Sequence, residues 1–109
     1  MLPTAELETK VFQALADPSR REIFKSLTRG ELAVKDLTAR FDLSQPAVSQ
    51  HLATLKDAGL VIGRREGKFV YYRVDPGGMR PLIDWIAHYR AFWTDNISRL
   101  ERLLDRIDK

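Results

Sequence analysis

The sequence has 109 residues, 44% of them hydrophobic, which suits one domain with a modest core. Its 18 lysines and arginines exceed its 15 acidic residues, and the net charge of +3 permits nucleic-acid binding without requiring it. The absence of cysteine excludes disulfides, thiolate metal sites and thiol redox sensing. No run is apolar enough for a signal peptide or a membrane span, so a cytoplasmic protein without membrane contact is expected.

Two helices are predicted before residue 30. The first is capped by Thr4 and runs to about Ala16. Its apolar face consists of Leu7, Val11, Phe12 and Leu15. Asp17-Pro18 then combines an N-cap with a proline at the first helical position, which starts a second helix that ends at Gly30. Its buried stripe is Ile23, Phe24 and Leu27.

The middle of the chain has the pattern of a helix-turn-helix. After a connector at Glu31-Leu32, a short third helix is expected to end near Asp42. It is marked by Val34, Leu37 and Phe41. Ser44 can cap the next helix, which Gly59 ends, and two short helices joined in this way are typical of a DNA reader. This second helix is expected to bury Val48, Leu52, Leu55 and Ala58.

A β-hairpin with basic residues at its tip is predicted next. Its strands are Val61–Arg65 and Phe69–Val74, joined by a turn at Glu66-Gly67. Alternation along the second strand places Tyr71 and Tyr72 on opposite faces, so at least one of them packs against the domain. The turn sequence that begins at Asp75 closes this part of the chain.

These elements supply a set of candidate DNA contacts. Base edges are assigned to Gln45, Ser49 and Gln50, because amides can pair bidentately with adenine and hydroxyls are permissive. Phosphates are assigned to Arg64, Arg65 and Lys68 in the hairpin. The set is completed by Ser44, Pro46 and His51. His51 has two possible roles, a phosphate contact or a bridge from the helix to its own domain.

The last segment, 79–107, is predicted to be one long helix that pairs with the same helix of a second subunit. Its heptad-like seam contains one extra four-residue step at Trp93. The expected dimerisation residues are Leu82, Ile86, Tyr89, Trp93, Ile97, Leu100 and Leu104. The alternative is a terminal helix folded onto its own domain. The aromatic residues Trp85, Tyr89, Phe92 and Trp93 are interpreted as dimer core, the alternative being a pocket for a small organic effector.

Nearly the whole chain resembles the ArsR/SmtB-type winged-helix repressors. The resemblance is carried by three segments, FQALADPSRREIFKSL, ELAVKDLTARFDLSQPAVSQHLATLKDAGLV and RREGKFVYYRV. It implies a mainly α fold with a small β-hairpin wing, a single domain over 1–109 and dimerisation through the terminal helices. It also implies a cytoplasmic homodimeric repressor that binds a palindromic operator in double-stranded DNA and is released by an inducer.

The chain departs from this family at its metal sites. Members that sense soft metals carry Cys-Val-Cys on the third helix, where this chain has Ala33-Val34-Lys35, and these side chains cannot bind a thiophilic metal. A second family site lies on the terminal helices, where this chain offers Asp84, His88 and Asp95. One imidazole and two carboxylates are a thin ligand set, and Asp84 with His88 can equally form a local hydrogen-bonded pair. No metal or other cofactor is therefore expected.

Other function classes have less support in the sequence. No nucleophile with a nearby base, no carboxylate pair and no phosphate-binding glycine loop is evident, so the protein is not expected to be an enzyme. The alternative to an operator-specific regulator is a protein-interaction module or an architectural DNA binder without operator specificity. The polar and basic residues on the predicted reading helix and wing argue against an interaction module, because such a module does not require them.

Overall fold

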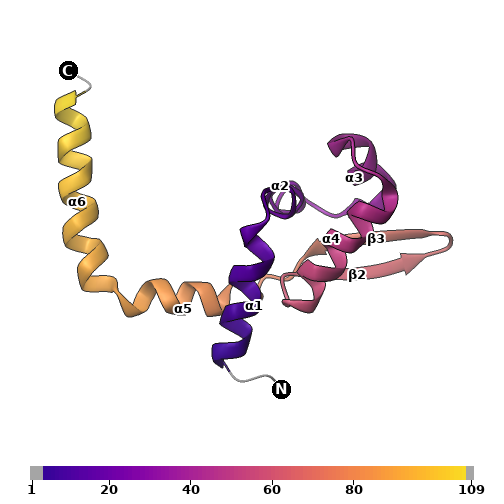
Figure 1. Cartoon of the computed structure of the whole chain (residues 1–109), viewed down its shortest axis with the longest axis horizontal. Helices are drawn as coiled ribbons and strands as arrows, with labels where there is room; N and C mark the ends of the chain where they lie inside the picture. Colours follow the sequence, from indigo (N-terminus) through magenta and orange to yellow (C-terminus); the bar gives the residue numbers. More distant parts are fainter. Residues whose placement is uncertain (1–3, 108–109) are drawn as a thin grey trace.

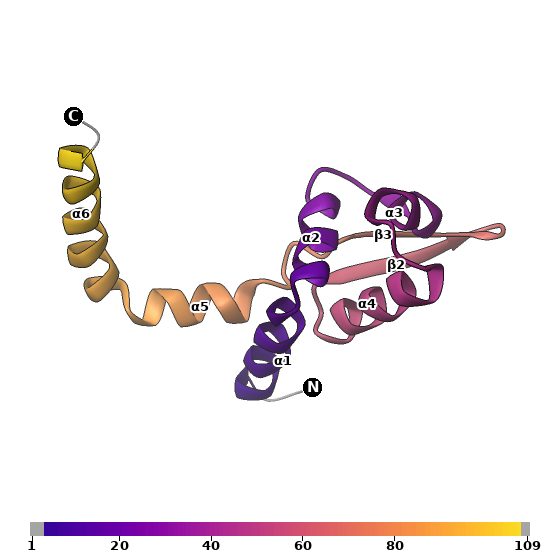
Figure 2. The same cartoon turned by 45° about the horizontal axis from the view of Figure 1, so that its top comes forward.

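The computed structural model describes residues 4–107, and the predicted domain bounds of 1–109 therefore include positions outside the described part. The role of the Thr4 side chain as a cap also lies outside it. The elements follow the order α1 (Thr4–Ala16), α2 (Pro18–Leu27), β1 (Leu32–Ala33), α3 (Val34–Phe41), α4 (Gln45–Asp57), β2 (Val61–Glu66), β3 (Phe69–Val74), α5 (Arg80–His88) and α6 (Arg90–Ile107). The fold is mainly helical with a small sheet, as predicted, and Figures 1 and 2 show its arrangement.

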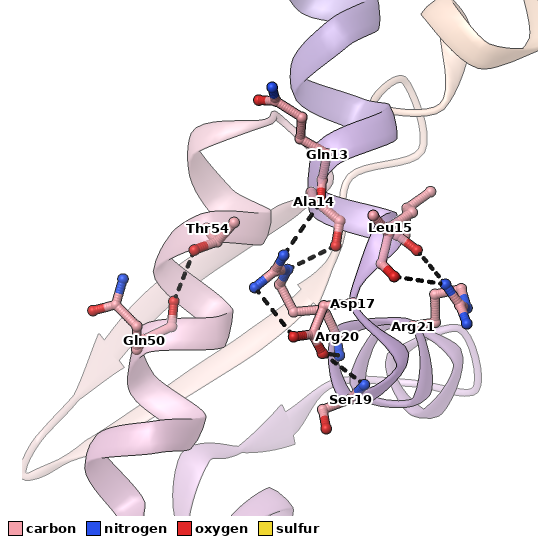
Figure 3. Close-up of polar contacts among 10 residues, drawn as sticks. Gln13, Ala14, Leu15, Asp17, Ser19, Arg20, Arg21, Gln50 and Thr54 are labelled. Atoms are coloured by element: carbon pink, nitrogen blue, oxygen red, sulfur yellow. Dashed lines mark hydrogen bonds and ion pairs between the residues drawn. The ribbon is translucent and has the colours of Figure 1, made fainter.

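The junction between α1 and α2 is held by short-range hydrogen bonds (Figure 3). Asp17 caps α2 as predicted, because its Oδ1 accepts from the backbone N–H groups of Ser19 at 2.8 Å and Arg20 at 3.2 Å. The Arg20 side chain donates through Nε to the carbonyl of Ala14 at 2.7 Å, and Arg21 donates to the carbonyl of Leu15 at 2.7 Å. Two arginines of α2 thus satisfy carbonyls at the end of α1 that lack helical partners.

The helix-turn-helix consists of α3 and α4, and its start and core follow the predicted pattern. Ser44 caps α4, with its Oγ accepting from the N–H of Ala47 at 3.2 Å. The predicted apolar stripe of α4 is buried, with Val48, Leu52 and Leu55 fully inaccessible. Both helices therefore rest on one core, which α1, α2 and the first residues of β2 complete.

The sheet differs from the predicted hairpin in two ways. Leu32 and Ala33, expected in part as a connector, form a third strand, β1, which pairs antiparallel with β3 in the order β1-β3-β2. The turn is Gly67-Lys68 instead of Glu66-Gly67, because Glu66 still pairs with Phe69. Gly67 has φ +63°, a backbone conformation that glycine adopts without a steric penalty.

The predicted single terminal helix is in fact two helices. α5 ends at His88, Tyr89 leaves the helical conformation with φ −107° and ψ 27°, and α6 turns away from the body (Figures 1 and 2). Only the first part of α5 packs on the body, and the rest of α5 projects from it together with α6 (Figures 1 and 2). On α5, Leu82 packs on the core, and the Trp85 ring meets the ring of Phe12 edge-on at 5.3 Å. Phe12, expected on a buried face of α1, stays 39% exposed.

The arm formed by α5 and α6 makes the molecule extended. Its radius of gyration is 17.2 Å, whereas a compact domain of this length would have about 13 Å. The wing hairpin, β2 and β3, projects from the opposite side of the body (Figures 1 and 2). The helix-turn-helix and the wing therefore lie together at one end, and the apolar arm lies at the other.

Candidate nucleic-acid interface

The outward face of α4 presents the predicted base-reading side chains. Gln45, Ser49 and Gln50 are all exposed, while the opposite face of the same helix is buried in the core. The amide of Gln50 points away from the α1–α2 junction (Figure 3), and the hydrogen bond from the Thr54 hydroxyl, 3.1 Å, goes to its backbone carbonyl. The amide side chain is thus directed outward from a rigid helix. Ser44 and Pro46 are exposed at the start of α4.

The surroundings of His51 bear on the two roles that the sequence left open for it. Its residue is half-buried, and its Nδ1 is enclosed without a hydrogen-bond partner among residues 4–107. Its charge also acts on Asp17, whose pKa is lowered chiefly by the hydrogen bond from the Arg20 backbone N–H and to a smaller extent by His51. Part of the His51 ring is therefore enclosed by the protein, but it forms no hydrogen bond that would make it a bridge within the described residues.

A basic hollow joins α3, α4 and the wing. It has a volume of about 190 Å³, and its walls include Lys35, Gln45, Ser49, Lys68 and Phe69. The ammonium groups of Lys35 and Lys68 both lie over the Phe69 ring, 4.4 and 5.6 Å from its centre. Two cations from different elements thus converge beside the predicted reading residues of α4, an arrangement that suits a phosphate of the DNA backbone.

Lys35 and Phe69 were not among the predicted site residues. Lys35 is the second residue of α3 and Phe69 is the first of β3, so their contact joins positions far apart in the sequence. No local pattern signals such a contact. Lys68 was predicted from its place at the basic hairpin tip, and the structure places it beside Lys35.

The two wing arginines have different surroundings. Arg64, predicted to hold phosphate, is engaged in ion pairs with Glu31 at 2.6 Å and Glu66 at 2.7 Å. These carboxylates raise the pKa of Arg64 above its usual value, with Glu31 the larger cause. Arg65 is exposed, and within residues 4–107 it takes part in no ion pair. Of the three predicted phosphate contacts in the wing, Arg65 and Lys68 are thus the two that form no ion pair within residues 4–107.

The predicted dimerisation residues fall into two groups. Leu82 packs on its own core and Trp93 is half-buried. The rest are exposed large apolar side chains, namely Ile86, Tyr89, Ile97, Leu100 and Leu104. Ile83, Phe92, Leu103 and Ile107 extend the same apolar surface. Exposed apolar surface of this extent is typical of an interaction site.

Within one subunit, the four aromatic residues considered for an effector pocket form two separate pairs. Trp85 and Tyr89 are in edge-on contact at 5.4 Å and belong to the cluster with Phe12, whereas Phe92 and Trp93 pair on α6 at 5.1 Å. A hollow of about 320 Å³ lies inside the bend between α5 and α6, and Trp93 is the one of these four residues that lines it. It is lined otherwise by Ile83, Ile86, Ala87, Arg90 and Thr94.

The two family metal positions do not bring a set of metal ligands together within residues 4–107 of one subunit. Ala33 and Val34 are buried and apolar, and Lys35 is cationic. Asp84 instead forms an ion pair with Arg80, Oδ1 to Nε 3.0 Å, and Asp95 lies beyond the break on α6. Between residues 4 and 107, no three acidic, histidine or cysteine side chains are grouped to hold an ion. The helices described in that range include none that is long and apolar enough to cross a bilayer.

Comparison with known proteins identifies relatives over this region and beyond it. The sequence model of the bacterial regulatory proteins of the arsR family matches residues 17–62, from the cap of α2 into β2. The HTH-type transcriptional regulator Rv2034 of Mycobacterium tuberculosis is 41% identical over 88% of this chain and 87% of its own length. The transcriptional repressor SdpR of Bacillus subtilis is 34% identical over 72% of this chain and 88% of its own. A crystal structure of an ArsR family transcriptional regulator has a TM-score of 0.76 and 29% identity, covering 86% of this chain and 97% of that one.

Proposed function

The chain belongs to the arsR family of bacterial regulatory proteins and is a DNA-binding transcriptional regulator, and on this basis we propose that it is a homodimeric repressor acting on a palindromic operator. Its relatives are transcriptional regulators and not enzymes. Operator binding places the protein in the cytoplasm. Because no thiolate is present, any signal that releases it reaches the protein by a route other than cysteine ligation.

Reading of the operator is assigned to the start of α4. Gln45, Ser49 and Gln50 enter the major groove, where an amide can pair with adenine and a hydroxyl tolerates several bases. The wing follows the adjacent backbone, with Arg65 and Lys68 on phosphates. The observation that carries this proposal is the outward-facing polar turn of α4 beside two converging lysines.

Dimerisation is assigned to the arm. Its exposed apolar residues lie on one face of α6 and on neighbouring parts of α5, and a second copy would remove them from water. A two-fold axis through the arm would present two α4 helices, and these would match two half-sites about 34 Å apart. The palindromic operator follows from that symmetry.

The proposal is tested by fluorescence anisotropy on the DNA upstream of the protein's own gene and on a scrambled duplex, across a salt series. The unmodified protein should prefer the natural duplex, by about a thousandfold or more for a specific site. Gln50→Ala should relax the preference. Arg65→Ala should weaken binding to both duplexes equally and reduce the slope of log affinity against log salt by about one.

Three outcomes would contradict the proposal in different ways. Equal and steeply salt-dependent binding to both duplexes would indicate an architectural binder or a regulator of distant genes. No binding at low salt would indicate a protein-interaction module. Identical behaviour of the two variants would refute the division between base reading and phosphate binding.

A further inference from the structure

Arg64 donates hydrogen bonds to two carboxylates of its own chain. Its Nε donates to both carboxylate oxygens of Glu31, at 3.1 and 3.0 Å, and its Nη2 donates to Oε1 at 2.6 Å. Its Nη1 donates to Glu66 at 2.7 Å. The guanidinium carbon lies 4.6 Å from the centre of the Tyr71 ring, which covers one face of the cation. All three guanidinium nitrogens are thus engaged with protein carboxylates.

The contact with Glu31 crosses the whole sheet. Glu31 directly precedes β1, Arg64 lies on β2, and β3 runs between these two outer strands. Tyr71 on β3 pairs with Ala33 on one side and with Arg64 on the other, so Arg64 reaches over Tyr71 to meet Glu31. The arginine therefore links the wing strand β2 to the strand that leads into the helix-turn-helix.

This link has a mechanical consequence for the wing. β1 has only two residues, and the hairpin projects from the body (Figures 1 and 2). The backbone pairing of β1 with β3 is correspondingly short, which makes side-chain contacts across the sheet important for the orientation of the hairpin. A forked arginine–carboxylate contact is directional and holds its partners in one geometry.

The same contact works against a direct DNA contact by Arg64. A phosphate could accept only from the two remaining N–H groups of Arg64, one on each terminal nitrogen, and it would lie beside the negative charges of two carboxylates. Arg65 and Lys68 face no such competition. The hydrogen bonds from Arg64 also hold the pKa of Glu31 below its usual value, so this carboxylate stays charged at neutral pH.

We propose that Arg64 and Glu31 are positioning residues, which hold the wing at the angle that places Arg65 and Lys68 on the DNA backbone without contacting DNA themselves. This inference rests on the proposed DNA-binding function and goes beyond it. It makes a counterintuitive prediction, that removing the negative charge of Glu31 weakens binding to a polyanion.

The test uses the full chain and a labelled duplex of about 30 base pairs from upstream of its gene, in a salt series. Glu31→Gln and Arg64→Gln should each lower the affinity about two- to tenfold, because a loosened wing must be ordered on binding. Neither should change the salt slope, and the double variant should bind no worse than either single one. Arg65→Gln should lower the slope by about one.

Glu66→Gln is the matched control. It removes an equal charge from the other carboxylate partner of Arg64 but leaves the link between Arg64 and Glu31 in place, so it should leave the affinity unchanged or raise it slightly. The inference is overturned if Glu31→Gln raises the affinity as Glu66→Gln does, or if Arg64→Gln lowers the salt slope by about one. Either result would make Arg64 a phosphate ligand.

A measurement without DNA separates this inference from the proposed function. In free protein, Glu31→Gln should speed amide hydrogen exchange in residues 61–74 relative to α4, and Glu66→Gln should not. If the unmodified protein fails to bind DNA, the proposed function fails, yet the exchange result still decides whether the link orders the wing. Unchanged exchange in Glu31→Gln would overturn it.

Discussion

Leu100→Ala tests whether the arm joins two subunits. Leu100 lies in the middle of α6, is 54% exposed, and shares one helical face with Ile97 and Leu104. Full burial of a leucine contributes about 1.5 to 3 kcal/mol, so covering its remaining half contributes about 0.8 to 1.5 kcal/mol. A two-fold dimer contains this contact twice, and the truncation should cost about 1.5 to 3 kcal/mol per dimer.

The corresponding change is a roughly 10- to 150-fold weaker dimer. Sedimentation equilibrium over a range of protein concentrations measures this constant directly. Arg102→Ala is the control, because Arg102 lies on the opposite face of α6, and it should leave the constant unchanged. An unaltered dimer constant in Leu100→Ala, or equal weakening by both substitutions, would refute an interface along this face.

Two further predictions concern the reading end of the molecule. Lys35→Gln should weaken binding to all DNA sequences and lower the salt slope by about one, because Lys35 lies with Lys68 over Phe69. The salt series described above measures this slope. A changed base preference in the variant would contradict the prediction. Asp17 has a folded-state pKa below its usual value of 3.8, so its stabilisation is present above that pH and is lost as the pH falls through the lower folded value. Asp17→Asn should therefore show a smaller loss of melting temperature on acidification below about pH 4, and an unchanged pH dependence would contradict the role of the charge.

The helix starts could be predicted from the sequence because their causes are local. Asp17 and Ser44 each satisfy backbone N–H groups within three residues, and the structure shows both caps. The buried positions of α4 followed from helical periodicity for the same reason. The remaining polar positions were therefore predicted to lie on the exposed face, and the structure shows Gln45, Ser49 and Gln50 exposed.

The features that the sequence did not reveal depend on contacts between distant residues. Strand β1 is too short to have a pattern of its own, and it exists because β3 has an open edge beside it. The apolar spacing of 79–107 predicted a helix, but it carried no information on where the body surface ends and the chain turns at Tyr89.

The same division applies to the candidate interface. Charge at the hairpin tip identified Arg64, Arg65 and Lys68 as a group, because composition and position along the strand are visible in the sequence. Only the folded chain distinguishes them, since Glu31 reaches Arg64 from the far side of the sheet and Lys35 reaches Phe69 beside Lys68. Side-chain type and local periodicity are encoded residue by residue, whereas the partner of each charge is decided by which segments tertiary packing brings together.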